Sequence, residues 1–258
     1  MKKMKVWLVI SLLAVLAVVG GCGGEKKEAA QGEKPLRVGS ETTFAPFEFQ
    51  DEKTKQYIGF DIDLMEAIGR KMNRKIEIVS MGFDALIPAL GAGNIDAAIS
   101  GMTITETRKE KVAFSDPYYQ AGLSMVVREE NQDIREFKDL EGKKIGVQIG
   151  TTSANEAKKI AGATVREFNN APEAFMELQA GGVEVVINDK PVNDYYLAQA
   201  AAKGVKSVEK TLTSEEYGIA VDKKNAALAQ QISKALGEVK QSGEYDKIYQ
   251  KWFGVKKS

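Results

Sequence analysis

Apolar residues along the chain follow two spacings that alternate from one segment to the next. Short apolar runs predict strands, whereas apolar positions that recur every three or four residues predict helices. Residues 61–68 show the second spacing, because positions 62, 65, 68 and 72 fall on one helical face and acidic residues occupy the first turn. Strands are predicted in this first block at 36–39, 76–79 and 95–99, and Asp84 is expected to cap a helix that runs through Leu90 with Pro88 near its first turn.

A second block of alternating strands and helices follows residue 143. Its most apolar run, 183–187, is typical of a strand that is buried in a sheet. The predicted strands are 144–147, 165–168 and 183–187, the predicted helices are 153–160 and 171–179, and residues 226–252 form two amphipathic helices split at Ser242 and Gly243. This pattern predicts an α/β protein with two lobes.

The first 21 residues differ from the rest of the chain. Lys2, Lys3 and Lys5 precede an apolar run of about 14 residues at 6–19, which is short for a bilayer span. A cationic start, a short apolar core and small residues at its end are typical of a signal peptide. We therefore predict a signal peptide over residues 1–21.

Cys22 is the only cysteine of the chain and stands directly after this segment. A lone cysteine has no partner for a disulfide within the chain, so its position favours attachment of a lipid such as palmitate to its sulfur. Two alternatives remain open: a plain cleaved signal in which Cys22 is incidental, and an uncleaved membrane anchor. Residues 22–34 contain no large apolar side chain and predict a flexible tether.

The composition excludes several classes of function. The chain has 36 basic and 36 acidic residues, and three basic residues lie before Cys22, so the remainder carries a net charge of −3 and lacks the basic excess of a nucleic-acid-binding protein. Without histidine, a histidine-based triad is excluded, and no metal site or cofactor is expected. About 237 residues follow residue 21, enough for one large or two small domains.

Aromatic side chains follow two of the predicted strands. Phe44 and Phe83 come after strand ends, and such positions lie at the ligand-binding edge of an open α/β sheet. Phe47 and Phe49 are expected to pack in the core instead.

Residues 100–108 begin where a buried strand ends. Gly101 permits close approach of the backbone to a ligand, and the hydroxyls of Ser100 and Thr103 suit an anion. Arg108 would then clamp a carboxylate through two parallel hydrogen bonds. The alternative is a solvated helix arginine beside Lys109 and Lys111.

Two further segments carry candidate polar groups. Residues 148–153, with Gln148, Thr151 and Thr152, join a strand to a helix start and form either a second anion cradle or an ordinary helix cap. Asp189 ends a buried strand, and its carboxylate either caps the next segment or binds a ligand ammonium group.

Together these segments resemble the polar amino acid binding proteins of ABC importers, solute-binding protein family 3. The resemblance runs from about Leu36 to Phe253. The segments that carry it are FAPFEF at 44–49, GFDIDL at 59–64, SGMTIT at 100–105 with Arg108, FSDPYY at 114–119 and YQKWFG at 249–254. It implies a periplasmic-binding-protein fold of type II, in which residues 35–120 with 218–258 form one lobe and 121–217 form the other, joined by two crossover strands.

The resemblance also implies roles for the candidate residues. Arg108 and residues 100–103 would hold the α-carboxylate of an amino acid, aided by Thr151 or Thr152, and Asp189 would bind its α-ammonium group. Phe44 and Phe83 would enclose the side chain, with Glu41 toward its far end. Asn188 stands where some glutamine binders have histidine, so the ligand specificity does not transfer.

The expected function is that of an extracytoplasmic lipoprotein, at the cell surface or in the periplasm. It would capture a polar L-amino acid by hinge closure and deliver it, as a monomer, to an ABC permease and its ATPase. Arginine or lysine is the favoured ligand because Glu41 suits a cation, and glutamine or another polar amino acid is the alternative. An enzyme is not expected, although a dehydratase with Glu41, Glu48 or Asp189 as general acid, or a sensor component, would use the same scaffold.

Overall fold

The computed structural model describes residues 34–254 except 200, 201 and 209. The predicted signal peptide and Cys22 lie outside these residues. No helix formed by the described residues has the length and apolar character that crossing a membrane requires.

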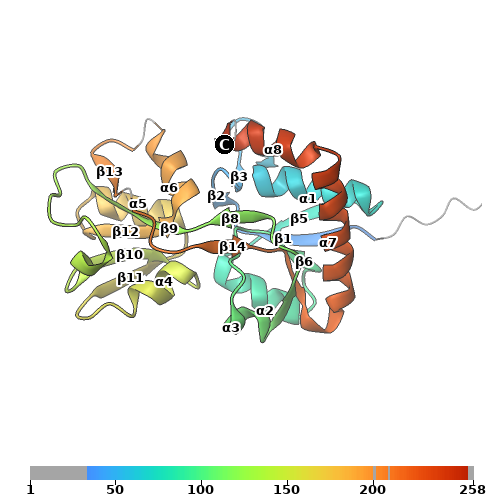
Figure 1. Ribbon diagram of the computed structural model, residues 1–258, viewed down its shortest axis with the longest axis horizontal. Coiled ribbons are helices and arrows are strands. Elements are labelled where there is room, and N and C mark those ends of the chain that lie inside the picture. The colour runs from blue at the N-terminus through green and yellow to red at the C-terminus, as the bar shows by residue number, and fades with distance from the viewer. Residues whose placement is uncertain (1–33, 200–201, 209, 255–258) are drawn as a thin grey trace, which may run out of the picture. The chain divides into compact units, whose positions relative to one another are not determined.

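The first sheet has the strand order β5-β1-β6-β15-β7. Strands β5 and β6 pair in parallel with β1, whereas β15 runs antiparallel to β6 and β7. Helices α1, α7 and α8 pack against one another, and α2 contacts β6 and β15 (Figure 1). The bounds are β1 Leu36–Ser40, α1 Phe60–Lys71, β5 Ile76–Ser80, α2 Leu86–Gly91, β6 Ala97–Ala98, α3 Glu106–Lys109, β7 Val112–Phe114, β15 Ala220–Asp222, η3 Lys223–Asn225, α7 Ala226–Gln241 and α8 Glu244–Phe253.

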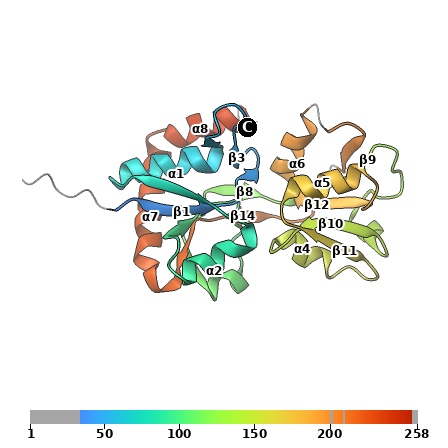
Figure 2. The same cartoon turned by 180° about the vertical axis from the view of Figure 1, so that it is seen from behind.

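The second sheet has the order β11-β10-β12-β9-β13. Its β10, β11 and β12 are parallel, and β9 runs antiparallel to both β12 and β13. Helices α4 and α5 pack on β10 and β12, and α6 packs on β9 and β13 (Figure 2). The bounds are β9 Leu123–Arg128, η2 Phe137–Leu140, β10 Lys144–Gln148, α4 Thr152–Ala157, β11 Thr164–Phe168, α5 Ala171–Gln179, β12 Val185–Asp189, α6 Lys190–Leu197 and β13 Val205–Val208.

Two antiparallel strands carry the chain from one sheet to the other and back. Strand β8 (Tyr119–Ala121) pairs with β14 (Glu215–Tyr217), so that Glu215 lies opposite Ala121 and Tyr217 opposite Tyr119. Both strands run between the two groups of elements in Figures 1 and 2. The two sheets confirm the predicted α/β class, and β8 and β14 confirm that two crossover strands join the lobes. The residue bounds of the lobes stay predictions.

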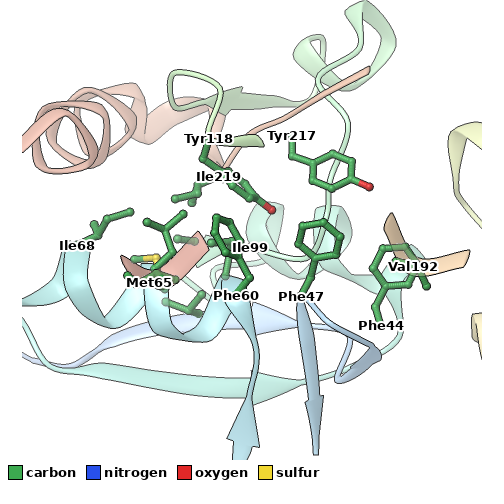
Figure 3. Packing of buried hydrophobic residues seen from close by; sticks show 14 of the residues in the cluster. Phe44, Phe47, Phe60, Met65, Ile68, Ile99, Tyr118, Val192, Tyr217 and Ile219 are labelled. Atoms are coloured by element: carbon green, nitrogen blue, oxygen red, sulfur yellow. The ribbon is translucent and has the colours of Figure 1, made fainter. Parts of the chain in front are cut away.

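A small sheet of β2 (Thr43–Phe44), β3 (Glu48–Gln50) and β4 (Tyr57–Ile58) places Phe47 against both crossovers. Figure 3 shows Phe60, Phe47 and Phe44 in a row, with Tyr118 and Tyr217 beside them. The Phe47 ring is fully buried and meets Tyr119 of β8, Tyr217 of β14 and Phe253 of α8 at 4.9, 5.3 and 5.3 Å between ring centroids. The core assignment of Phe47 is therefore confirmed, and Phe49 is half-buried between Tyr195 and Trp252.

The predicted cap at Asp84 is wrong. Asp84 lies inside a 3-10 turn, η1 (Phe83–Ala85), and its side chain caps no helix. The turn leads directly into α2, and the N–H of Leu86 donates to the Phe83 carbonyl, so backbone groups of the turn replace a side-chain cap. Two other elements are shorter than predicted: α4 ends at Ala157, and β6 is confined to Ala97 and Ala98.

Candidate functional site

One pocket is lined by residues from both sheets and their loops. The structure brings together all eleven residues that the sequence predicts for the site. They are Glu41, Phe44, Phe83, Ser100, Gly101, Thr103 and Arg108 from the side of the first sheet, and Gln148, Thr151, Thr152 and Asp189 from the side of the second.

Arg108 is a buried residue, with 9% of its surface exposed, so the alternative of a solvated helix arginine is wrong. Its Nη1 donates to the Thr103 carbonyl at 2.7 Å and its Nη2 to the Gly150 carbonyl at 3.1 Å. The guanidinium also lies 5.2 Å from the centre of the Phe83 ring. The charges of Asp189 and Glu215 act on Arg108 against the effect of its burial. Its two hydrogen bonds to carbonyl groups leave further N–H donors of the guanidinium for an anion.

Asp189 is the last residue of β12, and its carboxylate is buried. It precedes α6 without a side-chain cap hydrogen bond, so the capping alternative is wrong. Its Oδ1 has no hydrogen-bond partner among the described residues. Burial, together with the charge of Glu215, raises the pKa of Asp189 to about 8, against the opposing effects of Tyr217 and Arg108. A positively charged ligand group at this position would offset both effects.

Glu41 presents a second carboxylate oxygen without a partner. Its Oε1 accepts a hydrogen bond from the Thr43 hydroxyl at 2.6 Å, whereas Oε2 is buried and has no partner among the described residues. Burial raises the pKa of Glu41, and the hydrogen bonds from Thr43 oppose the rise. An unpartnered buried carboxylate oxygen favours a ligand that donates a hydrogen bond or carries a positive charge.

Glu215 on the crossover strand β14 belongs to this group of charges, although the sequence analysis missed it. Its Oε2 accepts from the hydroxyls of Thr103 at 2.6 Å and Thr152 at 2.9 Å, and its Oε1 accepts from Thr213 at 3.1 Å. Glu215 and Tyr217 are buried while Glu216 between them is exposed. This alternation, next to the predicted return crossover, is the signal that could have identified Glu215.

Several hydroxyl groups of the pocket are already engaged by the protein. Thr103 and Thr152 donate theirs to Glu215, and Thr151 donates to the Gln148 carbonyl at 2.7 Å while it accepts from the Ala154 N–H at 3.2 Å. The hydroxyl of Thr151 therefore caps α4, as one of the two interpretations of this segment had it. What these threonines can offer an anion in this arrangement is their backbone N–H groups rather than their hydroxyls.

Residues 100 and 101 likewise direct their polar groups toward the protein. The Ser100 hydroxyl donates to Glu48 Oε1 at 2.7 Å, and the Gly101 N–H donates to Asp61 Oδ2 at 3.0 Å. Gly101 has a φ of 54°, and a Cβ added there would lie 3.0 Å from the Phe44 ring. Only glycine fits both this backbone conformation and the close contact with the aromatic wall.

The chain is similar to several known binding proteins and solved structures. A probable histidine-binding protein from Neisseria gonorrhoeae is 38% identical, over 97% of this chain and 96% of its own length. The lysine/arginine/ornithine-binding periplasmic protein of Escherichia coli (strain K12) is 34% identical, over 94% and 96%. The structure of an ancestral arginine-binding protein bound to arginine is 50% identical, with a TM-score of 0.83 over 86% of this chain and 100% of that one, and the structure of one bound to glutamine is 52% identical, with a TM-score of 0.82 over 85% and 98%.

A family match covers almost the whole of the part that the structure describes. It extends over residues 36–255, which include both sheets, both crossovers and every residue of the pocket. The chain belongs to the bacterial extracellular solute-binding proteins, family 3.

Proposed function

We propose that the protein is an extracytoplasmic binding protein that captures a free cationic L-amino acid, arginine or lysine, and delivers it to an ABC importer. Its family is one of extracellular solute-binding proteins, and the relatives described above are named for binding histidine, arginine, lysine and ornithine. These names describe binding proteins rather than enzymes. Delivery to an importer is what membership of the family implies.

The balance of charge in the pocket is the observation that carries this proposal. Arg108 is the only cationic side chain among the described residues that line it, whereas Glu41 and Asp189 line it with carboxylates and Glu215 hydrogen-bonds two of its threonines. Two of these carboxylates each present a buried oxygen without a partner. A cationic amino acid has one anionic and two cationic groups, so it complements this arrangement better than a neutral zwitterion.

Each ligand group has a place in this assignment. Arg108 binds the α-carboxylate, Asp189 binds the α-ammonium group, and Glu41 binds the cationic end of the side chain. The rings of Phe44 and Phe83 enclose the aliphatic part and add cation–π attraction. Because a buried charge without a partner is costly, a ligand is fully paired only when both sides of the pocket enclose it. Hinge closure about β8 and β14 then follows from the higher affinity of the closed state.

Glutamine is the alternative ligand. An ancestral arginine-binding protein that is 52% identical to this chain is known in a glutamine-bound structure. The free Oε2 of Glu41 can accept a hydrogen bond from a side-chain amide as well as from a cation. This alternative leaves the charge of Glu41 without a counterion.

Exchange of Glu41 for glutamine separates the two ligands. We expect Glu41→Gln to weaken the binding of arginine and lysine by roughly 1.5–3 kcal/mol, because a hydrogen bond between two charged groups is lost, and to affect glutamine less. Isothermal titration calorimetry with each amino acid measures the difference. The exposed Glu52 offers a matched control, Glu52→Gln. The preference for cations is wrong if arginine affinity barely changes while the parent protein binds glutamine more tightly than arginine.

We also propose that the mature chain begins at a lipid-modified Cys22. The support is the sequence alone: an apolar core, two glycines and then the single cysteine. Cells grown with a clickable palmitate analogue should label the parent protein and not Cys22→Ala, as seen by fluorescence after gel separation. Gly24→Ala, which keeps the cysteine, should still be labelled. If the parent protein is not labelled, Cys22 carries no lipid, and residues 1–21 are either a plain cleaved signal peptide or an uncleaved membrane anchor.

A further inference from the structure

Two buried carboxyl groups lie directly behind the pocket and have no part in the binding scheme above. Glu48 on β3 and Asp61 in the first turn of α1 are both 0% exposed. They lie within hydrogen-bonding reach of each other. Figure 3 shows Tyr118, whose hydroxyl donates to Asp61.

Each carboxyl group has one oxygen with partners and one without. Glu48 Oε1 accepts from the Ser100 hydroxyl at 2.7 Å, and Asp61 Oδ2 accepts from the Gly101 N–H at 3.0 Å and the Tyr118 hydroxyl at 2.7 Å. The other two oxygens, Glu48 Oε2 and Asp61 Oδ1, have no hydrogen-bond partner among the described residues. Carboxylates only accept hydrogen bonds, so two ionised groups here would leave both oxygens unsatisfied.

Among the described residues, no cation acts as an electrostatic neighbour of the pair. No lysine or arginine is among the groups that influence either carboxyl; the charged neighbour of Glu48 besides Asp61 is Glu41, and Tyr118 faces Asp61. Burial and the charge of Asp61 raise the pKa of Glu48 well above its usual range. Burial also raises the pKa of Asp61, but only to about 6, because Tyr118, Gly101 and Glu48 donate to its ionised form. Two like charges in contact without a cation are not both stable in a buried site.

We propose that Glu48 and Asp61 hold one proton between them, as a hydrogen bond from Glu48 Oε2–H to Asp61 Oδ1, and that this pair positions residues 100 and 101 at the wall of the pocket. A single proton satisfies both of the oxygens that otherwise lack partners. It belongs to Glu48, because Asp61 already accepts from two other donors and is the better anion. The second half of the proposal rests on the proposed function, since it assigns the pair a role in amino acid binding.

The pair reaches the pocket through two short paths. On one side Glu48 bonds the Ser100 hydroxyl, which in turn accepts from the Glu41 N–H at 3.0 Å. On the other side Asp61 holds the Gly101 N–H, and Gly101 lies against the Phe44 ring. Loss of the pair therefore displaces the backbone of Glu41 and the aromatic wall together, although neither acid touches the ligand.

Infrared spectroscopy of the ligand-free protein tests whether Glu48 and Asp61 share a proton. At neutral pH we expect a carbonyl stretch of a protonated carboxyl group in the parent protein that is absent from Glu48→Gln and unchanged in the exposed control Glu52→Gln. A spectrum without a band that Glu48→Gln removes would overturn the shared proton. This measurement needs no ligand, so its failure is distinct from failure of the proposed amino acid binding.

Ligand affinity tests the positioning role. The amide of Glu48→Gln still donates to Asp61 and its oxygen still accepts from Ser100, so arginine affinity should stay within about threefold of the parent value. Glu48→Ala leaves Asp61 Oδ1 without a partner and the Ser100 hydroxyl without its acceptor. Asp61→Asn sets an N–H₂ group against the Glu48 O–H, so that Glu48 must ionise in a buried site without a cation. Both should weaken binding by more than about tenfold. Circular dichroism identifies any variant that does not fold. If Glu48→Ala does not fold, a loss of arginine affinity of more than about tenfold in Glu48→Gln is the result that contradicts the positioning role. If Glu48→Gln binds as weakly as Glu48→Ala, or if Glu48→Ala folds and binds like the parent, the positioning role is wrong.

Discussion

Replacement of Arg108 by alanine will weaken amino acid binding by roughly 3–5 kcal/mol, because the α-carboxylate of the ligand is then buried without a cation. Arg108 is the only cationic side chain among the described residues of the pocket, so no neighbour substitutes for it. Calorimetric titration with arginine at neutral pH measures the loss. Arg108→Lys, which keeps the charge but not the planar fork, should recover only part of it.

Lys109 provides the matched control for this experiment. It is the next residue of α3, about half exposed, and pairs at the surface with Glu106 at 2.8 Å. Lys109→Ala should change the affinity by less than about 0.5 kcal/mol, as surface substitutions usually do. Equal binding by Arg108→Ala and Lys109→Ala, with both proteins folded by circular dichroism, would show that Arg108 does not bind the ligand.

The affinity for the ligand should rise with pH up to about 8. In the empty pocket the pKa of Asp189 is about 8, so its carboxyl is mostly protonated at pH 7. An ammonium group binds the ionised form, so ligand binding releases a proton, and affinity increases by up to about tenfold per pH unit below that pKa. The stability of the ligand-free protein depends on pH with the opposite sign. Because the pKa of Asp189 is raised from 3.8 to about 8, the folded protein binds more protons than the unfolded chain between these values, and its stability falls as pH rises from 3.8 to about 8.

Asp189→Asn should abolish this pH dependence and weaken binding at pH 8 by roughly 3–5 kcal/mol, since the ligand ammonium then lacks its counterion. Calorimetry in two buffers of different ionisation enthalpy counts the protons released. Asp194 serves as the control, because it is half exposed and pairs with Lys190 at 2.7 Å. A parent protein whose affinity is flat between pH 6 and 8 would refute the assignment of Asp189.

Local patterns predicted much of the fold. Helix α5 begins and ends where the sequence predicts, at Ala171 and Gln179, because Pro172 suits a first turn and the Asn170 side chain caps it. The prediction at Asp84 failed because a backbone turn before α2 provides what a side-chain cap would have provided. The apolar run at 95–99 is buried except for Asp96, but only Ala97 and Ala98 form ladder pairs on both sides.

The pocket could be predicted as a set of residues but not as a network. Loops at strand ends, together with the family resemblance, indicated all eleven lining residues. The role of Glu215 depends on hydrogen bonds to Thr103 and Thr152, which lie 112 and 63 positions away in the sequence. The donors of Ser100 and Gly101 were expected to face an anion, and the structure directs both toward buried acids instead. Such contacts between distant segments leave no periodic signal in the sequence.

The hydrogen bonds of Glu215 have a consequence for the protein when no amino acid is bound. The Glu215 carboxylate on β14 accepts hydrogen bonds from Thr103 on one side of the pocket and from Thr152 on the other. Both bonds form together only while the two sides are close. If the two sides move about a hinge as proposed, these bonds favour the closed form even when no amino acid is bound. The equilibrium between the open and closed forms then already favours closure in part. A bound amino acid has to supply less free energy to complete it. If the protein delivers its solute to an importer as proposed, vacant molecules in this closed form would compete with loaded ones, and the hydrogen bonds of Glu215 on β14 would set how often this happens.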